Sequence, residues 1–375
     1  MKPIGVGVIG TGFMGKAHSI AYSASASVFG KGLRPKLEIV CDLSPERASQ
    51  RATDLGFSRY SDKWQDVVND EAVELISICT PNDTHAEIAI AALAAGKHVW
   101  CEKPMSTNIS DSLAMSLAAE KSSAKTIIGY NYTKNPAVTH ARRLIEKGTI
   151  GRLAGFFCRY DVDNEAAEER PWSWRMSREM SGTGSIGDVL SHVISVAHYL
   201  TGSSISQVVA DISIVHSKRN DPKQPNIEKI VDNDDMVAAL ARFENGIHGH
   251  IGASRVTWGK KCGLAWEIHG TKGTICYDQE RLNEIRLFTK SNDVATDGFR
   301  TILTGPYHPP YESFLPNGGH SLGYMDVKIC ELHELLSSIE TGTIVWPDFS
   351  AGLKIERVMD AVDRSTQTGG WETVG

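Results

Sequence analysis

The sequence lacks the features that would assign it to several other classes of protein. No run of about 18 apolar residues occurs in the 375-residue chain, so we expect no membrane span. The apolar stretch at residues 4–15 is interrupted by five glycines, so we expect no signal peptide there. Basic residues are not in excess, and the net charge of -6 argues against a nucleic-acid partner.

Paired cysteines are also missing. The seven cysteines are an odd number and form no CxxC pair, which argues against a disulfide framework and against a structural zinc site. Cys41, Cys79 and Cys101 fall in or beside apolar runs, as small buried side chains do. We therefore expect a cytoplasmic protein with reduced thiols. No internal repeat or low-complexity segment is present.

The length suits two domains, and the first 130 residues alternate short apolar strands with helical patterns. Such alternation predicts parallel strands joined by right-handed crossovers, and hence a doubly wound Rossmann sheet over residues 1–130. The predicted strands are Pro3–Gly10, Leu37–Asp42, Leu75–Thr80, His98–Cys101 and Thr126–Tyr130. The predicted helices are Met14–Ser25, Pro45–Asp54, Thr84–Ala95 and Asp111–Ser122.

After about residue 150 strand-like runs follow one another directly, with Asn245-Gly246 and Lys272-Gly273 as hairpin turns. This pattern predicts an α+β domain over residues 131–375 with a large, mostly antiparallel open sheet. Residues 291–325 read as a long ordered loop, and a last helix near Leu353–Arg364 could pack back on the first domain. The predicted strands are Leu153–Asp161, Gln207–His216, Met236–Phe243, Ile247–Ser254, Leu264–His269, Thr274–Asp278 and Ile285–Thr289.

A glycine-rich turn, Gly10-Thr11-Gly12-Phe13-Met14-Gly15, directly follows the first predicted strand and opens a helix. In this context the GxGxxG pattern is typical of dinucleotide binding. The first glycine allows the tight turn, the second lets a pyrophosphate approach the backbone, and the third lets the helix pack on the strand. The alternative is a glycine-rich turn that binds no ligand.

Asp42 ends the second predicted strand and is the candidate for binding the adenosine ribose. It lies 27 residues after Gly15, which is further than usual, and a small-residue insertion at 23–35 accounts for the excess. A carboxylate there favours NAD over NADP, although Arg47 nearby keeps NADP possible. The alternative role of Asp42 is to cap the helix that begins near Pro45.

Polar side chains also follow the third and fourth predicted strands. Ligands of open parallel sheets bind beyond the carboxyl ends of the strands, so Thr80, Asn82 and the Glu102-Lys103 pair are expected at the cofactor crevice. Pro104 favours an extended backbone at Lys103 and thereby directs its side chain. From spacing alone, Lys103 is equally well read as a solvated loop lysine.

These motifs, read in order, resemble the glucose–fructose oxidoreductase, inositol dehydrogenase and rhizopine-catabolism (Gfo/Idh/MocA) family. The resemblance rests on the GxGxxG turn, CTPNxxH at 79–85, GKHVWCEKP at 96–104, GYNY at 129–132, Trp174-Arg175, Gly182-Thr183-Gly184, Gly187-Asp188, His192 and HGTKG at 269–273. It implies a Rossmann domain with a second open-sheet domain, NAD(P) and sugar or cyclitol substrates. It also implies an active-site lysine and an Asp-xxx-His pair, here Lys103, Asp188 and His192. The insertion at 23–35 and the loop at 291–325 depart from simpler members.

The expected cofactor contacts therefore come from the glycine-rich turn and from the ends of the strands: Gly10, Gly12, Phe13, Met14, Gly15, Asp42, Thr80, Pro81, Asn82, His85, Glu102, Lys103 and Asn131. Besides Lys103 and His192, the expected substrate contacts are Tyr132, Trp174, Arg175 and one of Asp163, Asn164 or Glu165. Aromatic faces suit a sugar ring, and charged or amide groups bind its hydroxyls. Trp174 is alternatively a core residue beside a helix start.

The segment Ile186–Thr201 has helical periodicity, with Ile186, Val189, Leu190, Val193, Ile194, Ala197 and Leu200 in one apolar stripe. Asp188 and His192 share the opposite face with Ser195 and Tyr199, so Asp188 is expected to reach His192. From periodicity alone, an ordinary solvent-facing polar row explains this face as well. A zinc site would need a third ligand that the sequence does not place, so we expect no metal.

Taken with the resemblance, these residues predict an oxidoreductase that moves a hydride between a nicotinamide and a hydroxyl-bearing carbon of a sugar, anhydrosugar or cyclitol. Two alternatives stay open: an NAD-retaining enzyme that cleaves glycosides through transient oxidation, and a non-catalytic NAD-sensing regulator. We also expect a homodimer or homotetramer, because one face of the second sheet would otherwise leave an apolar patch of Val, Ile and Phe exposed.

Overall fold

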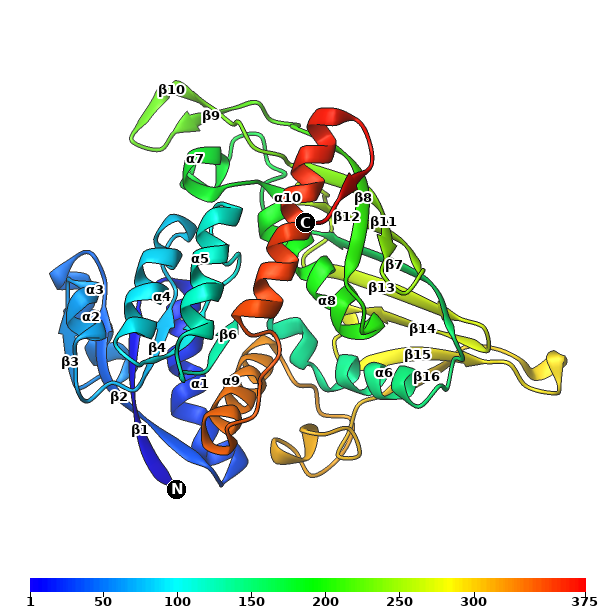
Figure 1. Cartoon of the computed structure of the whole chain (residues 1–375), viewed down its shortest axis with the longest axis horizontal. Coiled ribbons are helices and arrows are strands. Elements are labelled where there is room, and N and C mark those ends of the chain that lie inside the picture. Colours follow the sequence, from blue (N-terminus) through cyan, green and yellow to red (C-terminus); the bar gives the residue numbers. More distant parts are fainter. The chain divides into compact units, whose positions relative to one another are not determined.

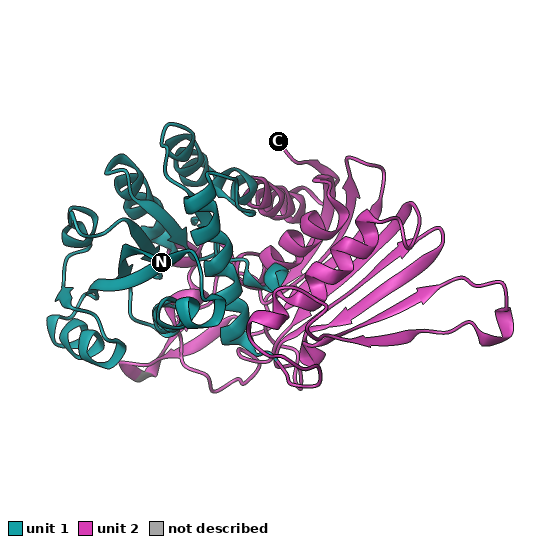
Figure 2. Ribbon diagram, turned by 90° about the horizontal axis from the view of Figure 1, so that it is seen from below, with its two compact units in different colours: residues 1–134, 322–353 teal, residues 135–321, 354–375 magenta. Residues whose placement is uncertain are grey.

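The computed structural model describes residues 1–375, apart from the side chain of Pro225. The chain forms two compact units, which Figure 2 colours separately. Unit 1 comprises Met1–Lys134 and Leu322–Leu353, and unit 2 comprises Asn135–Ser321 and Lys354–Gly375. The sequence led us to expect a single division near residue 130; in the structure the chain returns to unit 1 after residue 321. None of the described helices has the length and apolar character that a membrane span requires.

Unit 1 contains a six-stranded parallel sheet in the order β3-β2-β1-β4-β5-β6 (Figure 1). The last six residues of β1 are all buried, as expected for a strand covered by helices on both faces. The strand order reverses between β1 and β4, and the carboxyl ends of strands at such a switch point form the ligand crevice of doubly wound folds. The strands are β1 Lys2–Ile9, β2 Leu33–Cys41, β3 Arg59–Ser61, β4 Leu75–Ile78, β5 His98–Cys101 and β6 Thr126–Ile128.

The helices of unit 1 follow the predicted alternation, with one long addition near the carboxyl end. The insertion at 23–35 lengthens α1 and β2, which are joined by a short turn in which Gly30 and Gly32 have positive φ. The helices are α1 Phe13–Phe29, α2 Pro45–Leu55, α3 Trp64–Val68, α4 His85–Ala94, α5 Ile109–Glu120, α9 Tyr324–Thr341 and the first residues of α10 Phe349–Thr368, with short 3₁₀ turns η1 Asn82–Thr84 and η2 Asn131–Lys134.

Unit 2 is built on a nine-stranded sheet in the order β16-β15-β14-β13-β7-β12-β11-β8-β17. β7 and β12 pair in parallel, and the other neighbouring strands are antiparallel. The predicted fold class is therefore confirmed. The strands are β7 Leu153–Asp161, β8 Ile205–Ser213, β11 Met236–Phe243, β12 His248–Ser254, β13 Gly263–Gly270, β14 Gly273–Asp278, β15 Glu284–Thr289, β16 Arg300–Leu303 and β17 Glu372–Thr373, with a separate hairpin of β9 Lys218–Asp221 and β10 Gln224–Ile230.

Helices cover one face of this sheet (Figures 1 and 2). They are α6 Pro136–Glu146, α8 Ser191–Thr201 and the later part of α10; the shorter α7 Arg178–Ser181 and the turns η3 Trp174–Met176, η4 Ile186–Leu190 and η5 Gln279–Arg281 lie in the connections. Along β7, Phe156, Cys158 and Tyr160 are buried, whereas Phe157 and Arg159 on the opposite face are exposed. The second face of the sheet is therefore open in the single chain.

The segment expected to be one long loop, 291–325, contains short regular elements. They are η6 Val294–Thr296, strand β16 and η7 Tyr311–Ser313, and the loop ends where α9 begins. Helix α9 was not predicted from the sequence. Its start is capped by Asp326, whose Oδ2 accepts a hydrogen bond from the backbone N–H of Gly323 at 2.8 Å.

Candidate active site

The glycine-rich turn connects β1 to α1, and each of its glycines has a different steric environment. Gly10 has a φ of 93°, and a Cβ there would lie 2.5 Å from the carbonyl oxygen of Cys79. A Cβ on Gly15 would lie 1.9 Å from the carbonyl oxygen of Gly10, so close packing of helix on strand requires glycine. A Cβ on Gly12 would meet nothing within 4 Å, which leaves open space beside the helix amino terminus.

Asp42 follows β2 and binds this turn directly. Its Oδ2 accepts hydrogen bonds from the backbone N–H of Thr11, at 3.2 Å, and from the Thr11 hydroxyl. The guanidinium Nε of the half-exposed Arg47 lies 3.2 Å from the same Oδ2. Helix α2 is capped by Ser44, whose hydroxyl accepts from the N–H of Arg47. Asp42 therefore fixes the turn and does not cap the helix, which resolves the alternative that the sequence left open.

The residues around the turn fit a dinucleotide. The open space at Gly12 lies where a pyrophosphate would approach the helix amino terminus. Asn131, in η2, is only 2% exposed, and its Nδ2 has no hydrogen-bond partner among the described residues. A buried amide without a partner is costly unless a ligand supplies the acceptor. The space beside Gly12 and the unpartnered amide of Asn131 are both compatible with a bound nucleotide.

Lys103 lies in the turn after β5, and the Lys103–Pro104 peptide bond is cis. His85 braces this turn: Nδ1 lies 2.9 Å from the carbonyl oxygen of Pro104, and Nε2 lies 3.0 Å from that of Thr80. The imidazole is buried and connects the turns that follow β4 and β5. Lys103 itself is partly buried.

A buried charge cluster lies behind Glu102. The ammonium of Lys328, on α9, lies 2.6 Å from Oε1 of Glu102 and 2.7 Å from Oε2 of Glu331. His18 places Nε2 2.9 Å from Oε1 of Glu102 and Nδ1 2.9 Å from the hydroxyl of Ser77. His18, Glu102 and Glu331 could together ligate a metal ion, since their ligand atoms lie within 4.8 Å of one another. Lys328 already supplies the positive charge at this position.

The protonation of the cluster follows from burial and from these contacts. Burial alone would raise the pKa of Glu102, but Lys328 and the hydrogen bond from His18 outweigh it and hold that pKa well below its ordinary value. Burial lowers the pKa of His18 to about 4, so its imidazole is neutral at pH 7. Burial raises the pKa of Glu331 to about 7, although Lys328 acts in the opposite direction.

Tyr324, the first residue of α9, connects the glycine-rich turn with Tyr132. Its ring centroid lies 5.6 Å from that of Phe13 and 6.4 Å from that of Tyr132. Its hydroxyl lies 3.3 Å from the sulfur of Met14. The predicted cofactor residues Phe13 and Met14 and the predicted substrate residue Tyr132 therefore share one neighbour in unit 1, which the sequence did not reveal.

In unit 2 the predicted helix Ile186–Thr201 begins with a π-helical turn, η4, before α8. The N–H of Ser191 donates to the carbonyl of Ile186, five residues earlier. Such π turns occur frequently at functional sites. His192 is only 5% exposed and Ser195 only 1%, whereas Asp188 is partly exposed, so His192 itself does not face solvent. The ring of Tyr160 lies 5.8 Å from that of His192 in an edge-on arrangement.

The other predicted substrate residues of unit 2 lie in loops. Trp174 is only partly buried, so it is not a core residue. The guanidinium carbon of the exposed Arg175 lies over its ring, 4.3 Å from the ring centroid. Asp163 pairs with Lys261 at 2.5 Å. Glu165 is buried, pairs with Arg170 at 2.7 Å, and has its pKa raised by burial.

Sequence comparison assigns both units. Residues 4–130 match the NAD-binding Rossmann-fold domain of the Gfo/Idh/MocA oxidoreductases, and residues 138–276 match a carboxyl-terminal domain of the same group. The chain belongs to the Gfo/Idh/MocA family. The predicted membership, enzymatic class and NAD cofactor are thereby confirmed.

Several relatives resemble the chain over most of its length. Levoglucosan dehydrogenase of Pseudarthrobacter phenanthrenivorans is 36% identical over 390 aligned positions, covering 100% of this chain and 99% of the relative. Myo-inositol 2-dehydrogenase of Thermotoga maritima is 27% identical over 289 positions, covering 77% and 79%. A crystal structure of levoglucosan dehydrogenase with NADH and L-sorbose superposes with a TM-score of 0.97, at 37% identity over the whole of both chains.

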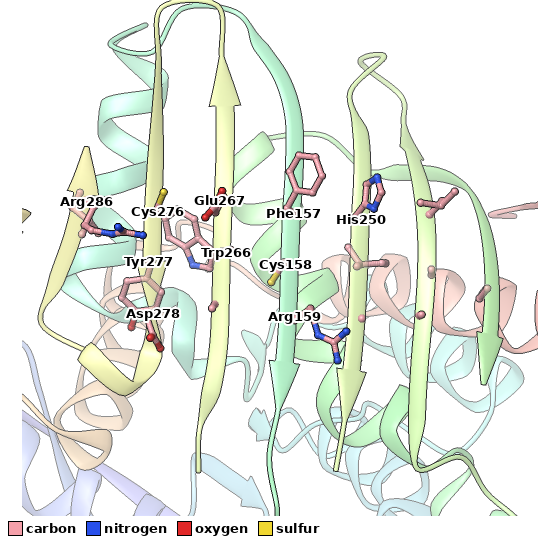
Figure 3. A pocket seen from close by; sticks show the side chains of 18 of the residues that line it. Phe157, Cys158, Arg159, His250, Trp266, Glu267, Cys276, Tyr277, Asp278 and Arg286 are labelled. Atoms are coloured by element: carbon pink, nitrogen blue, oxygen red, sulfur yellow. The ribbon is translucent and has the colours of Figure 1, made fainter. Parts of the chain in front are cut away.

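One large hollow of this Gfo/Idh/MocA protein contains none of the predicted site residues. It has a volume of about 1140 Å³ and lies on the open face of the unit 2 sheet. Figure 3 shows its side chains rising from neighbouring strands, with both signs of charge, among them Arg159, Glu267 and Arg286. The surface predicted to be a patch of Val, Ile and Phe is thus mixed, and the exposed apolar side chains on it include Phe157 and Leu240.

Sequence reasoning missed the residues that support the predicted ones. Lys328 and Glu331 lie three residues apart on an unpredicted helix, and this spacing was the available signal. Asn233, Asp234 and Asp235 form a run of three polar residues directly before β11. All three are buried in the structure, which is unusual for these residue types.

Proposed function

We propose that this protein is an NAD-dependent dehydrogenase that oxidises a secondary hydroxyl of a compact, uncharged cyclic polyol, with the anhydrosugar levoglucosan as the first candidate. The substrate class is supported by the full-length similarity to levoglucosan dehydrogenase. A crystal structure of that relative with NADH and levoglucosan has a TM-score of 0.96 to this chain.

The observation that carries the proposal is the burial of His192 on the helix that begins at the Asp188 π turn. A histidine on a solvent-facing row would have no reason to be buried. An imidazole titrates near neutral pH and suits removal of a hydroxyl proton.

In this proposal His192 takes the proton of the substrate hydroxyl, and Asp188 orients the imidazole. Lys103 donates a hydrogen bond to the same oxygen and stabilises its developing negative charge. Bound NAD supplies the hydride acceptor. Lysine has an ordinary pKa of about 10.4, so imidazole is the better base at neutral pH.

The cofactor is proposed to bind at the glycine-rich turn and the ends of the unit 1 strands. Gly10, Gly12 and Gly15 form the phosphate site, with Phe13 and Met14 in the same turn. The Oδ1 of Asp42 accepts a ribose hydroxyl and disfavours a 2′-phosphate. Further contacts are expected from Thr80, Pro81, Asn82, His85, Glu102, Lys103 and Asn131.

The substrate is proposed to contact Tyr132 in unit 1 and Trp174, Arg175 and Asp163 in unit 2. The stacked Trp174 and Arg175 offer a ring face and guanidinium donors within one short loop. Such a pair suits a sugar, whose ring presents C–H groups and hydroxyls together.

We further propose a homodimer or homotetramer in which a second copy covers the open sheet face of unit 2. Phe157 is 40% exposed and Leu240 is 42% exposed there, among side chains of both charges. A surface with both signs of charge can complement itself across a twofold axis. The buried thiols Cys41 and Cys158 are not in disulfides, which supports a cytoplasmic location.

The test is a panel of anhydrosugars, sugars and cyclitols with NAD, read as NADH absorbance and by product analysis. We expect levoglucosan or a close analogue to be oxidised with stoichiometric NADH. Cleavage of a glycoside without net NADH would favour the NAD-retaining alternative, and NAD binding without turnover of any compound would favour a regulator.

A further inference from the structure

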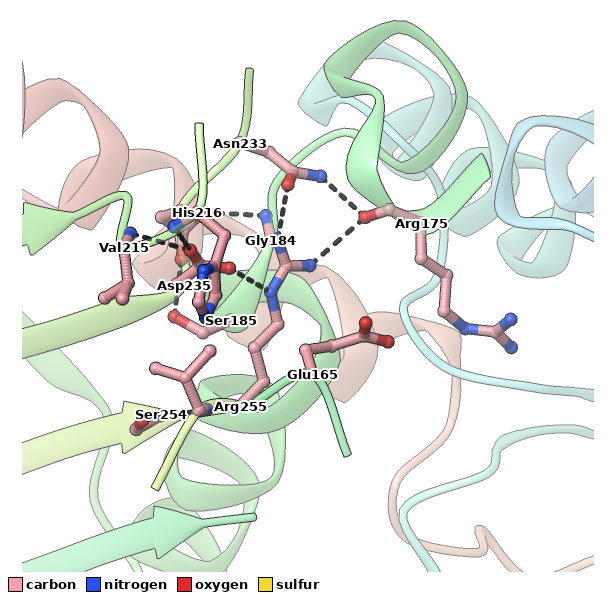
Figure 4. Close-up of polar contacts among 12 residues, drawn as sticks. Glu165, Arg175, Gly184, Ser185, Val215, His216, Asn233, Asp235, Ser254 and Arg255 are labelled. Carbon is pink, nitrogen blue, oxygen red and sulfur yellow. Dashed lines mark hydrogen bonds and ion pairs between the residues drawn. The ribbon is translucent and has the colours of Figure 1, made fainter. Parts of the chain in front are cut away.

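A buried polar cluster in unit 2 connects the Trp174–Arg175 loop with the start of the His192 helix (Figure 4). Its core is four residues that are each at most 2% exposed: Asn233, Asp234, Asp235 and Arg255. Three of them are consecutive and directly precede β11, and Arg255 directly follows β12. Burial of so many polar groups requires complete pairing.

One side of the cluster holds the backbone of Arg175. The carbonyl oxygen of Arg175 accepts from Nδ2 of Asn233 at 2.7 Å and from Nη1 of Arg255 at 3.1 Å. In Figure 4 both bonds converge on this oxygen, while the guanidinium of Arg175 points away from the cluster. The loop is thus anchored by its main chain, and the charged end of its side chain stays available beside Trp174.

The side chains of Asn233 and Arg255 are themselves held in place by further contacts. Nη2 of Arg255 donates to Oδ1 of Asn233 at 2.6 Å, and Nε of Arg255 lies 2.9 Å from Oδ1 of Asp235. The second oxygen of Asp235 accepts from the N–H groups of Val215 and His216. The orientation of Asn233 toward the Arg175 carbonyl is therefore determined by a chain of paired groups.

The other side of the cluster holds the segment that leads into the π turn. Asp234 accepts from the N–H of Gly184 at 2.7 Å, from the hydroxyl of Ser185 at 2.6 Å and from the N–H of Ile186 at 2.8 Å. Its backbone carbonyl accepts from the N–H of Ser185. A Cβ on Gly184 would lie 1.9 Å from that carbonyl, so the contact requires glycine. The carboxylate thus binds the positive end of the helix that carries Asp188 and His192.

We propose that Asn233 and Asp234 are positioning residues for the reaction, each acting on a different half of the unit 2 site. Asn233 positions the Trp174–Arg175 loop for substrate binding, and Asp234 positions the Asp188–His192 helix for proton transfer. This inference rests on the proposed dehydrogenase function.

The two residues are adjacent in the chain but are expected to affect different kinetic constants. A merely structural role would not separate the effect on KM from the effect on kcat. Asn233→Ala removes the side-chain donor to Arg175, so KM for the polyol should rise at least about tenfold with kcat within about threefold. Asp234→Asn cannot accept from all three donors, so kcat should fall at least about tenfold with KM within about threefold. The Kd for NADH should be unchanged in both, since the proposed cofactor site lies in unit 1.

Asn292→Ala, in an exposed loop, is the matched control and should leave all three constants unchanged. If Asn233→Ala does not fold, Asn233→Asp keeps the acceptor for Arg255, loses the donor to Arg175, and should raise KM in the same way. The proposal would be overturned if the Asn233 and Asp234 variants both fold and both keep the wild-type KM, or if both lose kcat to the same degree. A wild-type protein that oxidises no polyol would instead overturn the proposed function, whereas an active wild type with unaffected variants overturns only the positioning roles.

Discussion

The ammonium group of Lys328 lies 2.6 Å from the carboxylate of Glu102, the residue that immediately precedes Lys103. Both side chains are buried, and burial of an ion pair is tolerated only when its remaining groups are also paired. His18 and Glu331 supply those contacts. The turn that carries the proposed active-site lysine is therefore fixed from behind by a helix that comes more than two hundred residues later in the chain.

Glu331→Gln should change how stability depends on pH. Burial raises the pKa of Glu331 to about 7, above its value of 4.5 when unfolded, so the folded state binds the proton more tightly. Its favourable contribution is complete below the unfolded pKa and is lost as pH rises through about 7. The Tm of the variant minus that of the wild type should therefore increase between about pH 5 and about pH 8.

Glu340→Gln, an exposed position on the same helix, serves as the control and should show a difference in Tm that does not vary with pH. A difference for Glu331→Gln that is flat, or that decreases with pH, would contradict the assignment.

Lys103→Ala and His192→Ala should each lower kcat at least about a hundredfold while NADH still binds, because a positioned base typically contributes that much. Asp188→Asn should cost less and should shift the pH–rate profile, since in the proposed mechanism the imidazole of His192 would lose its charged partner. Steady-state kinetics with fluorescence titration of NADH measure both effects. The exposed Lys121→Ala and His248→Ala are controls. A His192→Ala variant that keeps more than about a tenth of wild-type kcat excludes His192 as the obligatory base.

Two alanine substitutions in one turn should separate cofactor binding from folding. Gly12→Ala places its methyl group in open space, so Tm should stay near the wild-type value while the Kd for NADH rises at least about tenfold. Gly15→Ala brings a Cβ within 1.9 Å of the Gly10 carbonyl oxygen and should lower Tm. Thermal melts and NADH titration distinguish the two. Unchanged NADH affinity in Gly12→Ala would place the pyrophosphate elsewhere.

NAD should be preferred over NADP, and Asp42→Asn should reduce that preference at least about tenfold in kcat/KM. The amide keeps an acceptor for Thr11 but removes the charge that repels a 2′-phosphate, and Arg47 is close enough to bind one. The exposed Asp62→Asn is the control. Equal kcat/KM values for the two cofactors in the wild type would refute the role of Asp42.

Phe157→Asp should convert the proposed oligomer to monomers at micromolar concentration, as measured by light scattering. The side chain is 40% exposed on the open sheet face, and a carboxylate there would be desolvated by a second copy. Leu117→Asp, on α5 with 43% exposure, is matched in exposure and should not change the mass. A monomeric wild type would rule out the assembly.

The sequence predicted the fold class and the elements that carry the motifs. β5, β7 and β11 agree with the predicted bounds residue by residue, because short buried strands flanked by turn residues have clear limits. The short β3 and α3, and the β9–β10 hairpin, were missed. Helix α9 was missed because its buried side includes Lys328 and Glu331, which read as surface residues until their partners are known.

The sequence indicated which residues belong to the candidate site, but it did not indicate the tertiary contacts that hold them in place. The apolar stripe of the His192 helix is buried as its period indicates, yet the π turn at Ile186 has no sequence signal. The contacts of Asp234 with Gly184 and of Glu102 with Lys328 join positions 50 and 226 residues apart. Such pairings depend on tertiary structure, which local periodicity and propensity do not describe.

The return of the chain to unit 1 limits how a gene for this protein can be divided. A fragment that ends at Lys134 would encode the glycine-rich turn and Lys103 but not α9. It would leave Glu102 without the ammonium of Lys328 and would expose the surface that Tyr324 and Lys328 cover. Recombination that exchanges the whole of unit 1 between related genes therefore needs three crossovers, after residues 134, 321 and 353, and a chimera made with one crossover after residue 134 would combine a foreign α9 with its own Glu102.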